Sequence, residues 1–153
     1  MANKNSPIIL AFSGGLDTSF CVPWLKETYG KPVITVTVDT GGINKETSKH
    51  LKEHSKKLGA NDHILVNAKD DFFNDVLKFL IMGNIKKGNM YPLCVGSERV
   101  IQAKYLAKIA KDMHSDTVAH GCTAAGNDQI RFQIILKSLA PDLKILAPVR
   151  DQS

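Results

Sequence analysis

Short apolar runs alternate with longer amphipathic stretches along this 153-residue chain. The short runs are rich in β-branched residues and have the length of β-strands, and glycine-containing turns close the first two. They read "PIILAF" (7–12), "VITVTV" (33–38), "HILV" (63–66), "TVAH" (117–120) and "KILA" (144–147). This pattern predicts five β-strands.

Between these strands, apolar residues recur three or four positions apart, which is the spacing of one helix face. The helical sets are Phe73, Val76, Leu77 and Leu80; Val100, Ala103, Ala107 and Ala110; and Phe132, Ile135, Leu136 and Leu139. Strands that alternate with helices predict an α/β fold, with a parallel five-stranded sheet and helices on both faces. We expect a single domain, 1–153, because no repeat or linker interrupts the alternation.

The composition, 43% hydrophobic and 23% charged, is typical of a soluble globular protein. No apolar stretch approaches the roughly 18 residues of a membrane span, and the first residues lack the apolar core of a signal peptide. We therefore expect a cytoplasmic protein without membrane contact. Cys21, Cys94 and Cys122 form no CxxC pair. They predict neither a disulfide framework nor a zinc site, and we interpret them as small, half-buried apolar residues.

The net charge of +5 fits an anionic ligand, but much of it lies in one segment, "NKETSKHLKEHSKKLG" (44–59). There Lys, Glu and His surround sparse apolar positions at Leu51 and Leu58, which is typical of a solvated helix face. A nucleic-acid patch would need interleaved aromatic residues. We predict no nucleic-acid partner.

Three predicted strands are followed by glycine-bearing turns: "SGGLDTS", "DTGG" and "HGCTAAGND". One such turn is weak evidence, since glycine is needed wherever a strand reverses into a helix. In parallel sheets, however, ligands bind beyond the carboxyl ends of the strands. We expect the three turns to line one edge of the sheet and to form the binding site there.

The first turn has the composition of a phosphate-binding nest. Gly14 and Gly15 allow positive φ and close backbone approach, and the following helix directs its N-terminus to the same point. The hydroxyls of Ser13, Thr18 and Ser19 can add donors. The GxxxxGK[ST] and GxGxxG patterns are both absent, which argues against a Walker-type NTPase and a dinucleotide fold.

Asp17 lies within this phosphate-binding turn. A carboxylate would repel a phosphate unless a divalent cation lay between them, so the residue points to Mg²⁺. The alternative is that Asp17 only favours the helix N-terminus electrostatically. Both interpretations remain open on the sequence.

The turn after the fourth predicted strand leads into a helix that Asn127 and Asp128 open. Asn127 and Arg131 lie four apart on one face, with Asp128 in the same turn. Arg131 could hold a carboxylate and Asp128 an ammonium, as an amino-acid substrate requires. The alternative is that Asn127 is a cap and that Asp128 and Arg131 merely pair with each other.

These motifs together resemble a known family. SGGLDTS is similar to the SGGxD[ST] loop of the N-type ATP pyrophosphatases, which cleave ATP between its α and β phosphates. Within that superfamily the chain resembles argininosuccinate synthases, whose members carry AYSGGLDTS, a Tyr-centred loop before a helix, HGxTGxGNDQxRF and SLAP. This chain has "AFSGGLDTS", "MYPLCVGSERVIQA", "HGCTAAGNDQIRF" and "SLAPDLKILAPVR" in the same order, and the resemblance covers residues 8–150.

The resemblance implies a Rossmann-like, adenine nucleotide alpha hydrolase-like domain and the cofactors ATP and Mg²⁺. In the family, the citrulline ureido oxygen attacks the α-phosphate to give citrullyl-AMP and pyrophosphate, and the aspartate amine then displaces AMP. By resemblance, citrulline would contact Tyr91, Asn127 and Arg131, and aspartate would contact Thr123, Asn127 and Asp128. Catalytic roles would fall to Asp17, Ser13 and Asp128, with Asp17 as the metal ligand. The ATP contacts would be Ala11, Phe12, Ser13, Gly14, Gly15, Leu16, Asp17, Thr18, Ser19, Val38 and Gly121.

Four positions need separate comment. Ala124 stands where the family has glycine, which would strain the turn if positive φ is needed there. Gly96 takes the place of a hydroxyl residue that contacts citrulline. Pro23 lies inside the helix after the phosphate loop, where it should cost a hydrogen bond and a kink. His120, just before Gly121, is either a structural residue at the strand end or a base close to the phosphates.

Members of the family carry a second, larger domain after this point. It supplies further citrulline contacts and most of the interface of the homo-oligomer. We expect the 153 residues alone to be a monomer or a weak dimer, and to bind ATP without forming argininosuccinate. Two functions remain: the ATP pyrophosphatase domain of an argininosuccinate synthase, or an ATP-binding module of the same fold without ligase activity.

Overall fold

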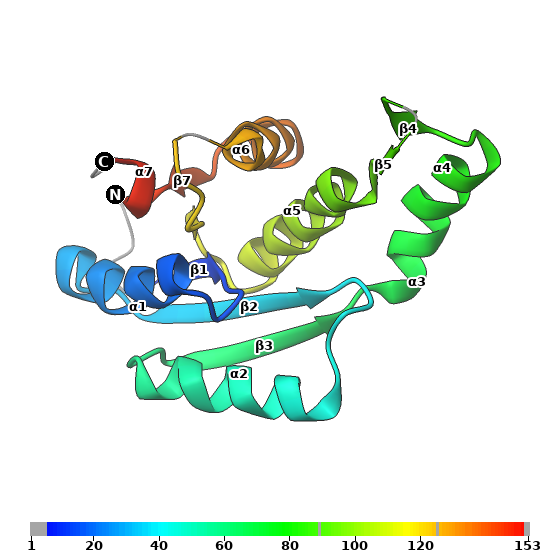
Figure 1. The fold of residues 1–153 in the computed structure, drawn as a ribbon. Helices are drawn as coiled ribbons and strands as arrows, with labels where there is room; N and C mark the ends of the chain where they lie inside the picture. The colour runs from blue at the N-terminus through cyan, green and yellow to red at the C-terminus, as the bar shows by residue number, and fades with distance from the viewer. Residues whose placement is uncertain (1–5, 89, 125, 152–153) are drawn as a thin grey trace.

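A computed structural model of the chain describes residues 6–88, 90–124 and 126–151. Its central element is a five-stranded parallel sheet in the order β3-β2-β1-β6-β7 (Figure 1). The strands are β1 (Ile8–Ala11), β2 (Val33–Asp39), β3 (Asp62–Asn67), β6 (Thr117–Ala119) and β7 (Lys144–Leu146). The predicted parallel five-stranded sheet is confirmed, and its strand ends agree with the predicted ones to within one residue.

Helices cover both faces of the sheet, as predicted. One core joins β1 and β2 to α5 (Cys94–Asp112) and α6 (Asn127–Leu139), around buried Ile9 and Leu136. The other core packs α1 (Leu16–Tyr29) and α2 (Lys45–Lys57) on the opposite face, around Leu10 and Leu25. Residues of both faces are apolar because a parallel strand is buried on both sides. The short helix α7 (Pro148–Asp151) follows β7.

The strand order reverses beside β1, because β2 and β3 continue to one side of it and β6 and β7 to the other. Ile9 pairs with Ile34 of β2 and with Val118 of β6. The carboxyl ends of β1 and β6 are therefore adjacent, which is where ligands bind in open parallel sheets. The turns that follow these two strands form the site described below.

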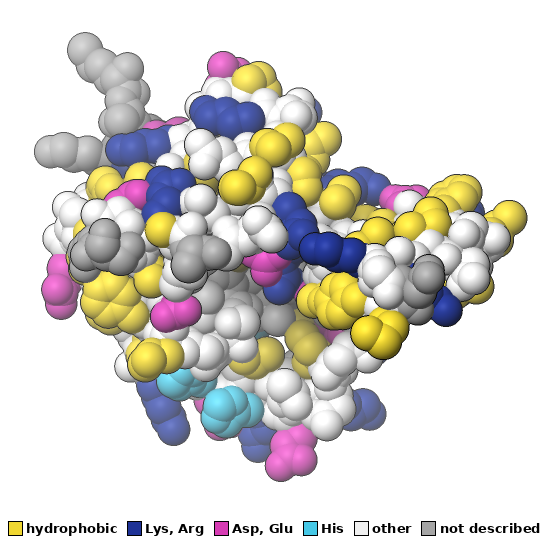
Figure 2. Space-filling view, turned by 45° about the horizontal axis from the view of Figure 1, so that its top comes forward, with side chains coloured by type: hydrophobic (Ala, Val, Ile, Leu, Met, Phe, Trp, Pro, Cys, Tyr) yellow, Lys and Arg dark blue, Asp and Glu magenta, His cyan; other side chains and the backbone are white. Residues whose placement is uncertain are grey.

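An arm that the sequence pattern predicts only in part connects β3 to α5. It comprises α3 (Lys69–Phe72), a π-helical segment η1 (Phe73–Leu77), α4 (Lys78–Met82) and a hairpin of β4 (Lys86–Lys87) and β5 (Tyr91–Pro92). The arm lies to the right of the sheet in Figure 1, and hydrophobic side chains gather on it in Figure 2. Its exposed apolar residues include Phe73, Phe79, Ile81, Met82, Ile85 and Met90.

Three residues of the predicted apolar helix faces lie in helices but are exposed. Phe73 is 50% exposed and Phe72 is buried instead, since the wider π-helical turn displaces the apolar face. In α5, Val100 is 43% exposed and Ile101 faces the core. Leu139 is 54% exposed because α6 ends at this residue. The remaining positions of the helical sets are buried or half-buried.

The predictions for the first two helices can also be compared with the structure. Helix α1 continues through Pro23 from Leu16 to Tyr29, although proline removes one backbone donor. Among the described residues, no contact accounts for the loss of that donor. Helix α2 is the predicted solvated helix, with Leu51 buried in an otherwise largely exposed sequence.

Candidate functional site

The turn between β1 and α1 presents free backbone donors. Gly14 has a φ of 77°, a conformation that favours glycine. The N–H groups of Leu16, Asp17 and Thr18 belong to the first helical turn, and none has a hydrogen-bond partner among the described residues. An anion is the natural partner for such a helix N-terminus.

Hydroxyl groups support the backbone of this turn. Thr18 Oγ1 donates to the Gly15 carbonyl at 3.2 Å and lies 3.2 Å from Ser13 Oγ. The Gly15 N–H donates to Ser13 Oγ at 3.4 Å. These contacts are long, so an incoming phosphate oxygen could replace them with shorter bonds.

The turn after β6 lies directly against the N-terminus of α1. A Cβ atom added to Gly121 would lie 3.1 Å from the Thr18 nitrogen and 3.2 Å from the Asp17 carbonyl carbon. Only glycine therefore allows the two backbones to approach this closely. The contact joins the first and third glycine-bearing turns at one edge of the sheet, as predicted.

A cavity of about 500 Å³ opens beside these turns. It contains all the predicted ATP-binding residues except Gly14 and Ser19. Its lining comprises Ala11, Phe12, Ser13, Gly15, Leu16, Asp17, Thr18, Val38 and Gly121, together with side chains of α2, α5 and α6. We call it the first cavity.

A second cavity of about 520 Å³ lies beside the first, between the β4–β5 hairpin, the N-terminus of α5 and the start of α6. Its lining contains every residue predicted to contact citrulline or aspartate: Tyr91, Thr123, Asn127, Asp128 and Arg131. Lys87 and Gly96 line it as well. The sequence did not indicate Lys87, because the hairpin that carries it has no clear strand pattern.

The two cavities have a common wall. Asp17, Gly121, Cys122 and Asp128 line both of them. The two cavities are therefore immediate neighbours, and the same four residues face both of them. All three residues predicted to be catalytic, Ser13, Asp17 and Asp128, line the first cavity, and two of them belong to the common wall.

Asp128 is held between two guanidinium groups. Its Oδ2 accepts from Arg99 Nε at 3.0 Å, and its Oδ1 accepts from Arg131 Nη1 at 2.6 Å. Burial by itself raises the pKa of this carboxyl, but the bonds and charges of the two arginines outweigh burial and lower it below the usual value. Asp128 is therefore ionised at neutral pH, with lone pairs left for a further donor.

The structure bears on the alternative that Asn127 is only a cap and that Asp128 and Arg131 merely pair with each other. The N-cap of α6 is Gly126, which has no side chain to cap the helix, and Asn127 is the first helical residue. Asp128 and Arg131 do pair with each other, but Asp128 also reaches Arg99 of α5. The pair is thus one half of a link between two helices that line the cavities.

Sequence reasoning missed the polar side chains of α5. Arg99 Nη1 donates to Glu98 Oε1 at 2.6 Å and to Gln102 Oε1 at 3.0 Å, and all three residues line the first cavity. Thr40 Oγ1 donates to Glu98 Oε2 at 3.1 Å, which ties the turn after β2 to α5. Three polar residues within five positions, near the start of a helix with a buried apolar face, were the available signal.

The structure describes two positions that depart from the family pattern, Gly96 and Ala124. At Gly96, an added Cβ would lie 3.1 Å from Arg131 Cζ, so the guanidinium rests against the glycine. Asn84 and His114 are the non-glycine residues with positive φ among those described, and Ala124 is not one of them. Ala124 therefore causes no strain of the kind considered above, while its neighbour at 125 lies outside the described residues.

His120 is 1% exposed, and its ring stacks on Phe132 with 5.4 Å between centroids. Burial, and then the charge of Arg150, lowers the pKa of His120 to about 4, so the ring is neutral. Nδ1 accepts from the Cys122 N–H at 3.3 Å, which places the proton on Nε2. Burial and stacking fit a structural role, although the residue also lines the first cavity.

The three cysteines are free thiols, with Cys21 buried and Cys94 and Cys122 half-buried. Burial is the main cause that raises the pKa of Cys21 to about 12 and that of Cys122 to about 11. Within residues 6–88, 90–124 and 126–151, no three His, Cys, Asp or Glu side chains gather as a metal cluster. None of the helices described in these ranges is long and apolar enough to cross a membrane.

Comparison with known proteins identifies similar sequences over nearly the whole chain. Residues 7–153 match the model of the family described as arginosuccinate synthase N-terminal HUP domain. The argininosuccinate synthase of Dictyoglomus thermophilum is 44% identical over 149 residues, which are 97% of this chain and 37% of that protein. The argininosuccinate synthase of Dictyoglomus turgidum is 42% identical over the same shares of both proteins. The chain thus spans about 37% of the length of these relatives.

A solved structure shows a similar fold. It is that of a predicted tRNA methyltransferase subunit from Methanocaldococcus jannaschii, with a TM-score of 0.66 and 18% sequence identity. The similarity covers 96% of this chain and 69% of that one. It concerns the fold alone, and it agrees with the Rossmann-like sheet described above.

Proposed function

This chain belongs to the arginosuccinate synthase N-terminal HUP domain family, and from this premise we propose that it is the ATP-binding part of an argininosuccinate synthase. The proposed reaction joins citrulline to aspartate, by way of citrullyl-AMP, with release of AMP and pyrophosphate. It is a step of arginine biosynthesis, catalysed by a carbon–nitrogen ligase. The observation that carries the proposal is the pair of cavities with a common wall at Asp17, Gly121, Cys122 and Asp128.

In this proposal, ATP occupies the first cavity with its phosphates at the turn between β1 and α1. The free N–H groups at Leu16, Asp17 and Thr18 would bind phosphate oxygens. Citrulline and aspartate occupy the second cavity, where Arg131 would hold a carboxylate and Asp128 an ammonium. The ureido oxygen and the α-phosphate then meet at the common wall, so catalysis is positioning and charge neutralisation.

Mg²⁺ fits this arrangement through Asp17. Its carboxylate is exposed on the first turn of α1, beside the proposed phosphate site. Mg²⁺ is commonly bound by one or two carboxylates together with substrate phosphates, so it needs no protein cage. When bound, the ion would neutralise phosphate charge, and Asp17 would hold it at the common wall.

The alternative function is an ATP-binding module without ligase activity of its own. The second cavity favours the synthase, because Tyr91, Thr123, Asn127 and Arg131 line a polar space that a nucleotide-only module has no use for. A cytoplasmic location, and a monomeric or weakly dimeric state of these 153 residues, stay predictions.

Calorimetric titration of the chain with ATP and Mg²⁺ tests nucleotide binding. Gly15→Val places methyl groups in the first cavity at a residue with a φ of −75°, where the added Cβ would meet only Ser13 Oγ at 3.5 Å. The fold should therefore survive while ATP affinity falls by more than about tenfold. Gly42→Val is the matched control, since an added Cβ there meets nothing within 4 Å. Equal ATP affinity in wild type and Gly15→Val would refute the proposal.

The ligase reaction is tested by pyrophosphate release with and without citrulline. We expect the 153 residues alone to bind ATP but to release negligible pyrophosphate, because a misplacement of about 1 Å can cost a hundredfold in rate. A longer chain that supplies the second domain of the relatives should show citrulline-dependent release. Release of that kind from the 153 residues would mean that this domain holds a complete adenylation site.

A further inference from the structure

Helix α2 contacts the phosphate-binding turn through a residue outside the motif. His54 Nε2 lies 2.9 Å from Ser19 Oγ, in the first turns of α1. The His54 ring is half-buried and lies 6.1 Å from the Phe12 ring. Leu51, one turn earlier in α2, lies beneath Gly14, where an added Cβ would meet Leu51 Cδ2. The face of α2 that carries Leu51 and His54 therefore packs against the phosphate-binding turn.

We propose that His54 is a positioning residue for the phosphate-binding turn: through Ser19, it holds the Gly14–Gly15 peptide in the orientation that binds a nucleotide phosphate. The inference rests on the proposed function, since it concerns ATP bound by the same turn. Ser19 itself does not line the first cavity, which agrees with a role behind the turn.

The geometry of one peptide group links these residues. Ser19 Oγ lies 3.5 Å from the Gly14 carbonyl oxygen and donates to it. In a trans peptide the carbonyl and the next N–H point in opposite directions. Holding the Gly14 carbonyl toward α1 therefore turns the Gly15 N–H toward Ser13 Oγ, on the cavity side. That N–H then contributes to the nest.

The proposal predicts the imidazole tautomer. A serine hydroxyl has one hydrogen, and in the proposed arrangement Ser19 gives it to Gly14 across 3.5 Å. Ser19 Oγ then accepts from His54 across 2.9 Å, so Nε2 of His54 would carry a proton. Without this donor, the Ser19 hydroxyl is free to turn toward the Gly15 carbonyl four residues before it, an alternative common in helices.

Neighbouring contacts fix α2 so that His54 can act in this way. Ser55 Oγ lies 2.6 Å from Thr35 Oγ1, and the same Thr35 oxygen lies 2.9 Å from His63 Nδ1. This buried group anchors α2 to β2 and β3 at the position next to His54. His50, which is exposed, stacks on the His54 ring with 5.8 Å between centroids and 15° between planes, but no hydrogen bond among the described residues joins it to Ser19 or to the phosphate-binding turn.

The test is calorimetric titration of the chain with Mg²⁺ and ATP for a set of variants. His54→Leu should weaken ATP binding about five- to tenfold, the value of one neutral hydrogen bond. His54→Gln keeps an N–H donor at the Nε2 position and should stay within about twofold of wild type. His50→Leu makes the same change one turn earlier in α2. It is the control and should bind ATP as wild type does.

A double-mutant cycle shows whether His54 acts through Ser19. In a Ser19→Ala background, His54→Leu should cause no further loss of affinity. Additive losses, a failure of His54→Gln to restore binding, or an equal loss in His50→Leu would overturn the inference. Urea unfolding of each variant separates loss of affinity from loss of fold.

A readout independent of ATP separates this inference from the proposed function. Nitrogen-15 NMR of the histidine rings should show His54 as the Nε2–H tautomer in wild type and a changed signal in Ser19→Ala. If wild type fails to bind ATP but shows this tautomer and its dependence on Ser19, the proposed function fails and the positioning contact stands. If ATP binds and His54 is the Nδ1–H tautomer, the positioning inference fails alone.

Discussion

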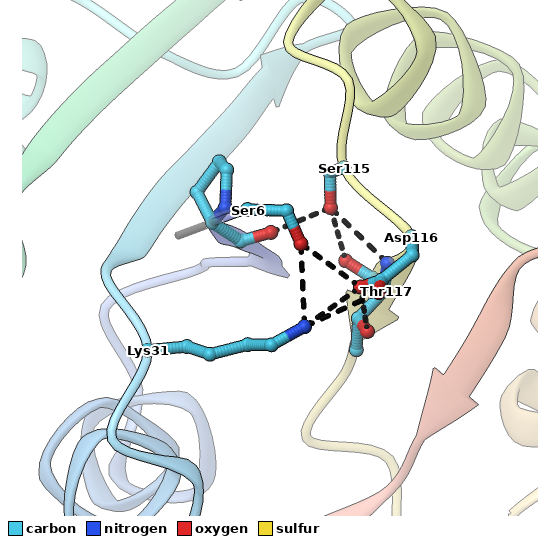
Figure 3. A network of polar contacts seen from close by, with 6 residues as sticks. Ser6, Lys31, Ser115, Asp116 and Thr117 are labelled. Carbon is cyan, nitrogen blue, oxygen red and sulfur yellow. Dashed lines mark hydrogen bonds and ion pairs between the residues drawn. The ribbon is translucent and has the colours of Figure 1, made fainter. Parts of the chain in front are cut away.

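At the amino-terminal edge of the sheet, polar side chains bond one another, whereas at the carboxyl-terminal edge several backbone donors find no partner among the described residues. Lys31 Nζ lies 2.9 Å from Asp116 Oδ1 and 3.2 Å from Ser6 Oγ (Figure 3). Ser115 Oγ donates to the Pro7 carbonyl at 2.6 Å. At the opposite edge, the first N–H groups of α1 have no such partner within the part of the chain that the structure describes.

The two edges of the sheet therefore differ in what their polar groups can do. Polar groups that satisfy each other stabilise the fold, and polar groups left unsatisfied are available to a ligand. The amino-terminal network ties the starts of β1 and β6 together, so that their carboxyl ends stay adjacent. The amino-terminal edge therefore stabilises the fold, and we expect only substitutions at the carboxyl-terminal edge to change ATP affinity.

The largest expected effect is an acid-dependent loss of stability at the carboxyl end of β6. His120 keeps a neutral ring in the fold down to about pH 4, while the unfolded chain takes up a proton near pH 6.5. Stability is then fully present above pH 6.5 and falls as the pH drops toward 4, by about 3 kcal/mol. Urea unfolding of wild type from pH 7 to 4 measures the loss. His120→Gln cannot titrate and should show a flatter profile; equal profiles would contradict the prediction.

The next effect concerns the contact between the two glycine-bearing turns. Gly121→Val forces a side chain against the backbone of Asp17 and Thr18. An added Cβ would lie only 3.1 Å from the Thr18 nitrogen and 3.2 Å from the Asp17 carbonyl carbon. We expect a loss of about 1–3 kcal/mol in the free energy of unfolding, together with weaker ATP binding. Thermal unfolding and calorimetry on the same variant check the two effects. Stability lost with unchanged ATP affinity would show that the contact does not shape the site.

At the amino-terminal edge we expect the reverse. Lys31→Met removes the ammonium from Asp116 and should cost about 1 kcal/mol of unfolding free energy, a value reduced because Asp116 is 43% exposed. ATP affinity should not change. A change in affinity greater than about threefold, measured by the same titration, would break the division between the two edges.

The pH dependence of this variant provides its control. Hydrogen bonds from Thr117 and Lys31 lower the pKa of the Asp116 carboxyl below its usual value. The stability it contributes is present above the unfolded pKa, about 3.9, and is lost as the pH falls through the lowered folded value. The difference between wild type and Lys31→Met should therefore be constant from pH 7 to 5 and shrink below about pH 4.

The smallest effect sets the background for the comparison. Lys49 and Glu53 of α2 form an ion pair at 3.9 Å, and both are mostly exposed. Lys49→Ala should change the free energy of unfolding by less than about 0.5 kcal/mol and leave ATP binding unchanged. Urea unfolding at low and high salt checks this. A larger change would mean that exposed pairs matter here as much as the amino-terminal network.

The sequence by itself determined the class of fold and the motif at its edge. Alternating apolar runs and helical periods predict the five strands, because periodicity is a local property of the chain. Gly14 and Gly15 between a strand and a helix predict the phosphate nest, because backbone conformation there depends on the residues themselves. Asn127, Asp128 and Arg131 follow from helical spacing in the same way.

The tertiary structure alone decided what lies across from these residues. Strand order places β6 beside β1, and so Gly121 against Thr18, which no local pattern encodes. The links from Arg99 to Asp128 and from His54 to Ser19 join segments 29 and 35 residues apart. Periodicity reports which side of an element is buried, and even this fails at Phe73 and Leu139. Which element covers that side depends on the packing of the whole domain.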